Sequence, residues 1–337
     1  MSTGAYRRAG VDLEAAAAAT ELIAALAAET RRPEVVEDVG GFAGLYRIGE
    51  GRLLAAATDG VGTKIELARL AARFDTVGID LVAMSANDVV CTGAEPLFFL
   101  DYLAVGKLVP EEAAAIVAGV AEGCRRAGCA LLGGETAEHP GVLEAGRFDL
   151  AGFCVGLVGE NDRLGPHRVE PGDVLLGLPS SGLHSNGFSL VRRLIDDAGI
   201  DPFAVPEELD RPLIEELLEP TTIYVGAVLA AAREGLVHAA AHVTGGGIPE
   251  NLPRALPEGL GAEVERGAWE PLPVFSVIQR LAEDSSFGLY RTLNMGMGLI
   301  LVVPGSAAAD AAAAMAEHGV SAVEIGRVEE GTGIRFT

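Results

Sequence analysis

The chain has 337 residues, with 48 acidic against 25 basic side chains and a formal net charge of −23 at pH 7. Such a charge repels polyanions, so we expect no nucleic-acid partner, and a small anionic substrate would need local positive charge. No apolar run is long enough to span a membrane and no signal peptide is recognised, so we expect a cytoplasmic protein without a membrane partner. The four cysteines lack CxxC spacing, which predicts reduced thiols and no zinc site.

Apolar periodicity and turn residues predict alternating strands and helices in the first half of the chain. The predicted helices are 12–29, 64–73, 80–91 and 110–128, and the predicted strands are 52–58, 97–105, 129–132 and 149–158. Pro110, Glu111 and Glu112 give the fourth helix a typical N-terminus. The strand 129–132 is expected to break at Gly133 and Gly134.

A turn-rich stretch at 160–173 then predicts a boundary, which divides the chain into domains 1–165 and 166–337. The second half is expected to hold strands 173–178, 236–243, 289–303 and 323–328 and helices 188–198, 221–234, 249–256 and 306–318. This alternation predicts an α/β (α+β) fold in two layered domains.

The segment from Asp59 to Lys64, Asp-Gly-Val-Gly-Thr-Lys, follows a predicted strand and precedes a predicted helix. Gly60 and Gly62 would let backbone amides approach phosphate oxygens, with Thr63 and the helix N-terminus beside them. Lysine occurs only at positions 64 and 107, so we expect the Lys64 ammonium to neutralise a phosphate. The spacing is not that of a Walker A loop, and a tight turn with a surface lysine is the alternative.

Two further motifs place polar groups near apolar segments. Asn87 and Asp88 lie in an apolar helix pattern, where a buried carboxylate needs a partner or a metal ion. After the strand 129–132 the chain reads Gly133-Gly134-Glu135-Thr136. We expect Asp59, Asp88 and Glu135 to hold Mg²⁺, which prefers oxygen ligands; solvated acids in ordinary loops are the alternative.

Two polar loops of the second half are candidate anion sites, although each can also be an ordinary turn. In 180–187, Ser180, Ser181 and Asn186 are candidate phosphate ligands, and His184 is a candidate acid or base. The second loop, which follows His242, supplies further candidates: Thr244, Gly245, Gly246, Gly247 and Asn251.

As a set, these motifs resemble the phosphoribosylformylglycinamidine cyclo-ligase family, the aminoimidazole ribonucleotide synthetases of purine biosynthesis. The resemblance runs in order from about residue 6 to about 328. The segments that carry it are 6–12, 59–64, 78–84, 87–88, 93–102, 133–138, 180–189 and 242–251. Two departures are His139, where a hydrophobic residue is usual, and Leu293, where an aromatic is common.

The resemblance implies a homodimer, in which strands of the two N-terminal domains pair into a barrel with the C-terminal α+β domains outside. It also implies ATP-dependent ring closure of formylglycinamidine ribonucleotide to aminoimidazole ribonucleotide, ADP and phosphate, through an iminophosphate. Asp88, Lys64 and His184 would take part in catalysis. The remaining candidates, Asn87 among them, would hold Mg²⁺–ATP or substrate phosphate, with Asp101 a weaker metal candidate.

Other members of the same superfamily share the Asp-Gly and Asn-Asp elements. Thiamine-monophosphate kinase should lack the 180–187 loop in this form. Formylglycinamidine ribonucleotide synthetase is far longer, and selenide dikinase would need a catalytic cysteine or selenocysteine before Cys91. A non-catalytic nucleotide-binding scaffold is the alternative of another class, which ATP binding without turnover would support.

Overall fold

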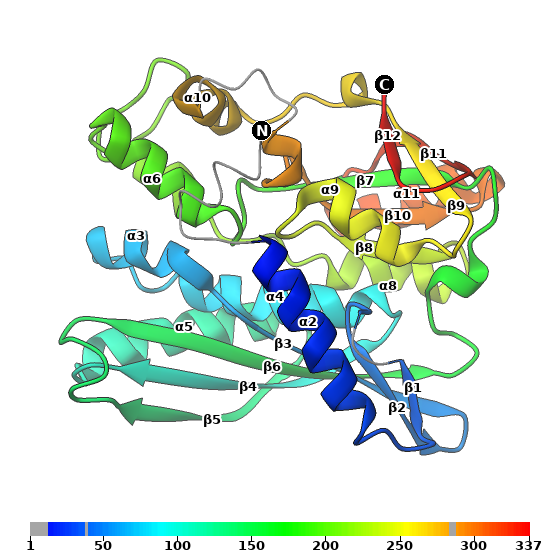
Figure 1. Ribbon diagram of the computed structural model, residues 1–337, viewed down its shortest axis with the longest axis horizontal. Helices are drawn as coiled ribbons and strands as arrows, with labels where there is room; N and C mark the ends of the chain where they lie inside the picture. Colours follow the sequence, from blue (N-terminus) through cyan, green and yellow to red (C-terminus); the bar gives the residue numbers. More distant parts are fainter. Residues whose placement is uncertain (1–12, 38–39, 283–287) are drawn as a thin grey trace.

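The computed structural model describes residues 13–37, 40–282 and 288–337, which form two six-stranded sheets with helices packed on them (Figure 1). The first sheet uses residues up to 159 and the second begins at residue 174. Segment 6–12 of the resemblance lies outside the described residues. The predicted α/β class with two layered parts is confirmed.

The N-terminal sheet has the strand order β1-β2-β3-β6-β4-β5. Its strands are β1 (Val35–Glu37), β2 (Gly44–Gly49), β3 (Arg52–Gly60), β4 (Glu95–Val105), β5 (Ala130–Glu138) and β6 (Phe148–Gly159). The helices of this part are α2 (Leu13–Ala28), α3 (Ile65–Leu70), α4 (Val77–Cys91) and α5 (Pro110–Ala127). Helices α4 and α5 lie together on one side of this sheet (Figure 1).

The C-terminal sheet has the order β12-β9-β11-β7-β10-β8. Its strands are β7 (Val174–Pro179), β8 (Ala239–His242), β9 (Leu260–Val264), β10 (Met297–Val303), β11 (Val323–Glu330) and β12 (Ile334–Phe336). Its helices are α6 (Phe188–Ala198), α7 (Leu213–Leu217), α8 (Val225–Arg233), α9 (Gly247–Asn251), α10 (Pro273–Ala282) and α11 (Ala308–Ala316). None of the helices in the described part is long and apolar enough to cross a bilayer.

Helix α4 joins the two halves because it packs against strands β3 and β6 on one side and against α8 and β8 on the other. All its residues except Asp88 are buried. Four of them, Asp80, Met84, Asn87 and Asp88, follow the i, i+4, i+7, i+8 spacing of one helix face. We call these four residues the α4 stripe; each contacts a residue of the C-terminal half, as described below.

The expected break at Gly133 and Gly134 is wrong, because β5 continues to Glu138 in parallel pairing with β4. Gly134 pairs with Asp101, and a Cβ at position 134 would lie 2.3 Å from Asp101 Oδ1. Glycine is therefore used here for close packing inside a strand rather than for a turn. Strands β2 and β9, which are short, were not predicted. Helix α10 was missed although its apolar residues Val274, Phe275, Val277 and Ile278 follow a helical spacing and are buried.

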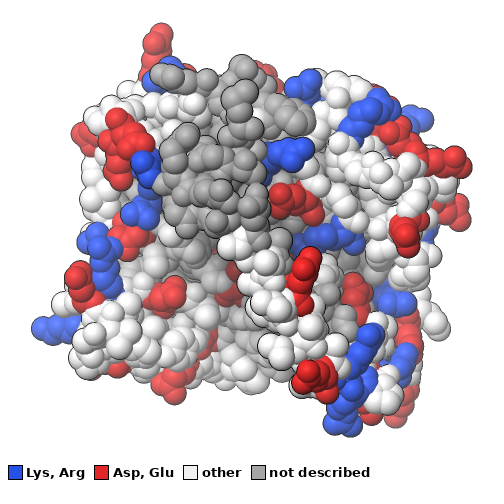
Figure 2. Space-filling model, viewed as in Figure 1, with Lys and Arg blue, Asp and Glu red and all other residues white. Residues whose placement is uncertain are grey.

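The described surface mixes both signs of charge (Figure 2). Many arginines are engaged by neighbouring acids. Arg335 contacts Glu263 and Glu329, and Arg211 contacts Glu216 and Glu219. All four cysteines are free thiols and three of them are buried, as expected.

Candidate functional site

Two carboxylates and a histidine meet where the two halves of the chain join. Asp59 ends strand β3, Asp88 ends the α4 stripe, and His242 ends strand β8. Asp88 Oδ1 lies 2.8 Å from His242 Nδ1, and the His242 side chain is buried. Burial raises the pKa of Asp59, and the negative charge of Asp88 raises it further.

The expected grouping of Asp59, Asp88 and Glu135 around one metal ion is wrong for a single chain. Within the described ranges, no three His, Cys, Asp or Glu side chains lie close enough to hold a metal. Along the register, Asp59 faces Gly152, then Asp101, then Gly134, which precedes Glu135. Three strand spacings of ~4.8 Å place Glu135 roughly 14 Å from Asp59.

Asp59 and Asp88 nevertheless fit a Mg²⁺–nucleotide site. Mg²⁺ keeps several waters and commonly takes only one or two protein carboxylates together with substrate phosphates. The pKa of Asp59 is raised mainly by burial and further by the negative charge of Asp88, and a cation between the two carboxylates would remove the repulsion between them. Asp88 uses only Oδ1 for His242, which leaves Oδ2 as a possible metal ligand.

The predicted phosphate loop opens onto a cavity of about 630 Å³. Gly62 and Thr63 are exposed and line it, and Asp149 lies at its other side. Gly62 has φ +68°, a conformation that favours glycine. Arg147, which pairs with Glu66, also lines the cavity, together with the acids Glu66, Glu144 and Asp149. The cavity has room for a phosphate chain beside Gly62 and Thr63.

Lys64 does not reach this cavity. Its side chain is fully buried, and its Nζ donates to Asp80 Oδ1 at 2.9 Å and to the carbonyls of His184 and Glu219 at 2.9 and 2.8 Å. An ammonium group has three donor hydrogens, so none remains for a phosphate oxygen. The structure therefore contradicts the expected contact between Lys64 and phosphate.

Asn87 is also committed to protein contacts rather than to nucleotide. Its Nδ2 donates to Thr222 O and its Oδ1 accepts from Tyr224 N, each at 2.9 Å. The side chain is fully buried. Asn87 thus holds the segment before α8 against α4, which contradicts its predicted role in cofactor binding.

His184 is buried in the 180–187 loop with φ +62°. Its Nε2 accepts from the backbone N–H groups of Ser181 at 3.3 Å and Thr222 at 3.4 Å. Burial holds the pKa of His184 well below its usual range, with the positive fields of His242 and Lys64 adding to this effect. The ring is therefore neutral, and its Nδ1 has no partner among the described residues.

The remaining polar side chains of this loop shape it. Ser180 Oγ donates to Asn294 Oδ1 at 3.2 Å, and Ser181 Oγ donates to Pro220 O at 2.6 Å. Asn186 is half-buried, and its Nδ2 lies 3.7 Å from Met84 Sδ of the α4 stripe. Of these three candidates, Asn186 keeps a free amide oxygen, 3.6 Å from the place of a Cβ on Gly245.

The second glycine loop lies beside Asn186. Thr244 is half-buried and Gly245 is exposed, whereas Gly246 and Gly247 are buried. Asn251 is buried, and its Nδ2 donates to the carbonyls of Gly245 and Gly247. Asn251 therefore orders the loop from inside, while Thr244 and Gly245 are the members that a ligand can reach.

Gly133, Gly134, Glu135 and Thr136 lie exposed on β5, which forms the far edge of the N-terminal sheet. The structure thus separates this motif from Asp59 and Asp88 within one chain. His242, by contrast, was not chosen as a site residue from the sequence. The available signal was its position between a predicted strand and a glycine loop.

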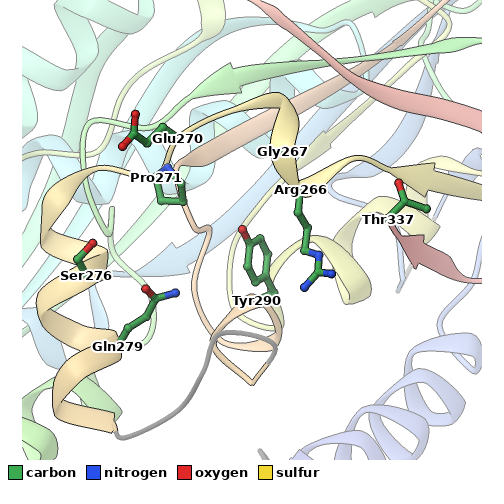
Figure 3. A pocket seen from close by; sticks show the side chains of 8 residues that line it. All are labelled: Arg266, Gly267, Glu270, Pro271, Ser276, Gln279, Tyr290 and Thr337. Carbon is green, nitrogen blue, oxygen red and sulfur yellow. The ribbon is translucent and has the colours of Figure 1, made fainter.

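A separate cavity of about 580 Å³ lies in the C-terminal half (Figure 3). Its polar lining includes Arg266, Glu270, Ser276, Gln279, Tyr290 and Thr337. Figure 3 shows Ser276 and Gln279 on helix α10, facing Tyr290 and Arg266 across the opening. None of the residues predicted from the sequence lines this cavity.

The comparisons with known proteins relate both halves of the chain to the same group of proteins. Residues 40–158 match the N-terminal domain model, and residues 170–337 the C-terminal domain model, of AIR synthase related proteins. The solved structure of tt0281 from Thermus thermophilus aligns with a TM-score of 0.66 at 26% identity, covering 94% of this chain and 95% of that one. A thiamine-monophosphate kinase from Stenotrophomonas maltophilia shares the fold, with a TM-score of 0.63 at 18% identity over 94% and 95% of the chains.

Two curated relatives are much more similar in sequence. The phosphoribosylformylglycinamidine cyclo-ligase of Myxococcus xanthus is 53% identical over 97% of this chain and 96% of its own. That of Thermosynechococcus vestitus is 51% identical over 97% of both chains. The identity to these relatives extends over almost the whole chain and agrees with the motifs found in the sequence. The chain therefore belongs to the phosphoribosylformylglycinamidine cyclo-ligase family of enzymes.

Proposed function

We propose that the chain closes the imidazole ring of formylglycinamidine ribonucleotide with ATP, giving aminoimidazole ribonucleotide, ADP and phosphate. The supporting observation is identity of about half the residues, end to end, to relatives named for this cyclo-ligation. An ADP complex of a Thermotoga maritima PurL, which shares the fold at 17% identity and a TM-score of 0.59 over 88% of this chain and 43% of that one, is compatible with a nucleotide substrate.

The reaction needs an activated oxygen. The γ-phosphoryl group passes from ATP to the formyl oxygen and the amide N–H loses its proton, which gives an iminophosphate and ADP. The amidine nitrogen then attacks that carbon, loses a proton, and phosphate leaves. Phosphoryl transfer depends mainly on positioning and on stabilising negative charge.

In this proposal the phosphates of ATP lie in the cavity beside Gly62 and Thr63, and Gly60 ends strand β3 two residues before Gly62. Asp59 and Asp88 Oδ2 would hold Mg²⁺, which neutralises phosphate charge when bound. Thr244 and Gly245 remain candidates for the phosphate of the ribonucleotide.

His242 and His184 have different roles in this proposal. In the neutral tautomer of His242 that donates from Nδ1 to Asp88, Nε2 carries a lone pair, and Nε2 has no partner in the described part of the chain. We propose that Nε2 accepts the proton released on ring closure, directly or through water. His184 instead orders the 180–187 loop, because its Nε2 already accepts two backbone N–H groups.

The test uses the purified protein with Mg²⁺, ATP and formylglycinamidine ribonucleotide, and measures ADP together with the aromatic amine of the product. Formation of both in a one-to-one ratio is the expected result. ADP without the amine would refute the acceptor, and neither product with ATP still bound would favour a non-catalytic scaffold.

We further propose a homodimer built on the N-terminal sheet, in the cytoplasm. Helices α4 and α5 cover one side of this sheet, while large apolar side chains on β4, β5 and β6 stay exposed. Leu97, Tyr102, Leu132 and Phe153 are 42%, 39%, 65% and 40% exposed. Exposed apolar groups on neighbouring strands are typical of an interface, and a second copy also brings its own Glu135 to that surface.

Replacing Phe153 with glutamate places a charge at the centre of this surface. We expect the variant to elute as a monomer when its mass is measured by light scattering, whereas the wild type is a dimer. Phe203→Glu changes a phenylalanine that is 49% exposed in the other half and serves as the matched control. A wild-type monomer, or a Phe153→Glu dimer of unchanged affinity, would contradict the proposed interface.

A further inference from the structure

The buried ammonium of Lys64 connects three separate segments of the chain. Asp80 belongs to the α4 stripe, His184 to the 180–187 loop, and Glu219 to the connection before α8. They lie 16, 120 and 155 residues from Lys64 in the sequence. One side chain thus joins the strand end that carries the phosphate loop to two parts of the C-terminal half.

The segment after Glu219 is held by the same group of contacts. Asp80 Oδ1 accepts from Thr221 N at 2.8 Å and from Thr221 Oγ1 at 2.6 Å. Thr222 N in turn donates to His184 Nε2 at 3.4 Å. The carboxylate of Asp80 therefore balances the Lys64 charge and at the same time fixes the segment that contacts His184.

The conformation of His184 needs such support. Its φ of +62° is unfavourable for a residue with a side chain, so the surroundings must stabilise it. Lys64 holds its carbonyl, while Ser181 N and Thr222 N hold its ring. Ser185 Oγ, one residue further, donates to Val61 O at 2.8 Å inside the predicted phosphate loop.

We propose that Lys64 is a positioning residue, whose ammonium fastens the backbone of His184 and Glu219 to the end of the phosphate loop. It thereby sets the 180–187 loop relative to Gly62 and Thr63. The inference rests on the proposed function for the chemistry that this loop serves. Burial alone does not favour an ion pair, so the positioning role of Lys64 depends on its hydrogen bonds to the carbonyls of His184 and Glu219.

This proposal and a direct phosphate contact predict different kinetics for Lys64→Met, which keeps the length of the side chain and removes its charge. If Lys64 positions the loop, kcat falls by about 100-fold, as expected for misplacement by about 1 Å, while the KM for ATP changes little. If Lys64 binds phosphate, the KM for ATP rises at least as strongly as kcat falls.

Hydrogen–deuterium exchange of the free enzyme gives a second measurement that needs no turnover. In Lys64→Met we expect faster exchange in peptides that cover 180–187 and 219–224, since the Ser181 and Thr222 amides lose their fixed acceptor. Lys107→Met, at the only other lysine, is the matched control and should leave exchange and kinetics as in the wild type.

A second variant keeps Lys64 and removes its counter-charge. Asp80→Asn should also speed exchange in both segments and lower kcat. Because Asp80 contacts Thr221 directly, faster exchange in 219–224 is expected in any case, and only faster exchange in 180–187 supports the positioning role of Lys64. The proposal is overturned if Lys64→Met and Asp80→Asn both keep the exchange rates and the kcat of the wild type. A wild-type enzyme that forms no aminoimidazole ribonucleotide refutes the proposed function instead, and the exchange result still tests the positioning role.

Discussion

Replacing Asn87 with alanine removes both hydrogen bonds between the middle of α4 and the segment that precedes α8. Thr222 O then loses a donor and Tyr224 N loses an acceptor, at a site where Asn87 itself is fully buried. An unsatisfied buried polar group costs about 1–3 kcal/mol, so the two together should lower the free energy of unfolding by about 2–6 kcal/mol.

Urea unfolding followed by tryptophan fluorescence and by circular dichroism measures this change, with the two signals testing whether the halves unfold together. Asn161→Ala, at an exposed asparagine in the connection between the sheets, is the control and should change stability by less than about 0.5 kcal/mol. In the folded Asn87→Ala enzyme we expect an almost unchanged Kd for ATP. Full stability combined with weakened ATP binding would refute the structural role and restore Asn87 as a nucleotide ligand.

Two further predictions concern His184. Gly298→Ala would place a Cβ 2.1 Å from Tyr224 Oη and 2.3 Å from His184 Cε1. We therefore expect at least about 1–3 kcal/mol of destabilisation, measured by urea unfolding. We also expect a lower kcat for product formation in the folded fraction. Because the pKa of His184 is lowered on folding, its contribution to stability is complete above its ordinary value of about 6.5 and is lost as pH falls toward the folded value. The slope of the free energy of unfolding against pH is at most about 1.4 kcal/mol per pH unit. Between pH 7 and 5, His184→Asn should reduce this slope, whereas the exposed His318→Asn should leave it as in the wild type. Equal slopes in the two variants would contradict the buried neutral ring.

Local patterns predicted the regular elements well where start and stop signals were strong. Helix α5 begins at Pro110 and is followed by Gly128 in the left-handed conformation, as expected from its sequence. Helix α6 occupies the predicted range 188–198. The same reasoning failed at Gly133 and Gly134, because two adjacent glycines normally signal a turn and only the partner strand β4 explains them.

The site was harder to predict because its contacts are tertiary. The rarity of lysine drew attention to Lys64, but the acceptors of its ammonium lie in segments that only the fold brings together. Asp59 and Asp88 are near enough for the charge of Asp88 to raise the pKa of Asp59, whereas Glu135 lies on the far edge of the sheet, and the shared metal site stays a prediction. Sequence order along the chain carried no information about which strand edge each motif would occupy.

The α4 stripe is the sequence feature from which contacts between the two halves could have been predicted. Asp80, Met84, Asn87 and Asp88 lie on one face of a helix whose other faces are apolar except for Ser85. In the structure this face meets Thr221, Asn186, Tyr224 and His242, in that order. Three polar groups on a buried helix face imply polar partners from another part of the chain, since each would otherwise be unsatisfied.

This stripe also explains why binding and structural residues are mixed along α4. Asp80 and Asn87 are seven residues apart, which is close to two helical turns, so they support the C-terminal half at two points along one line. Asp88 is rotated by about 100° from Asn87, which turns it toward Asp59 and His242 at the edge of that contact. A shift of the C-terminal half along α4 would therefore move His242 relative to Asp88, and the contacts of Asp80 and Asn87 keep the geometry of the candidate site by preventing it.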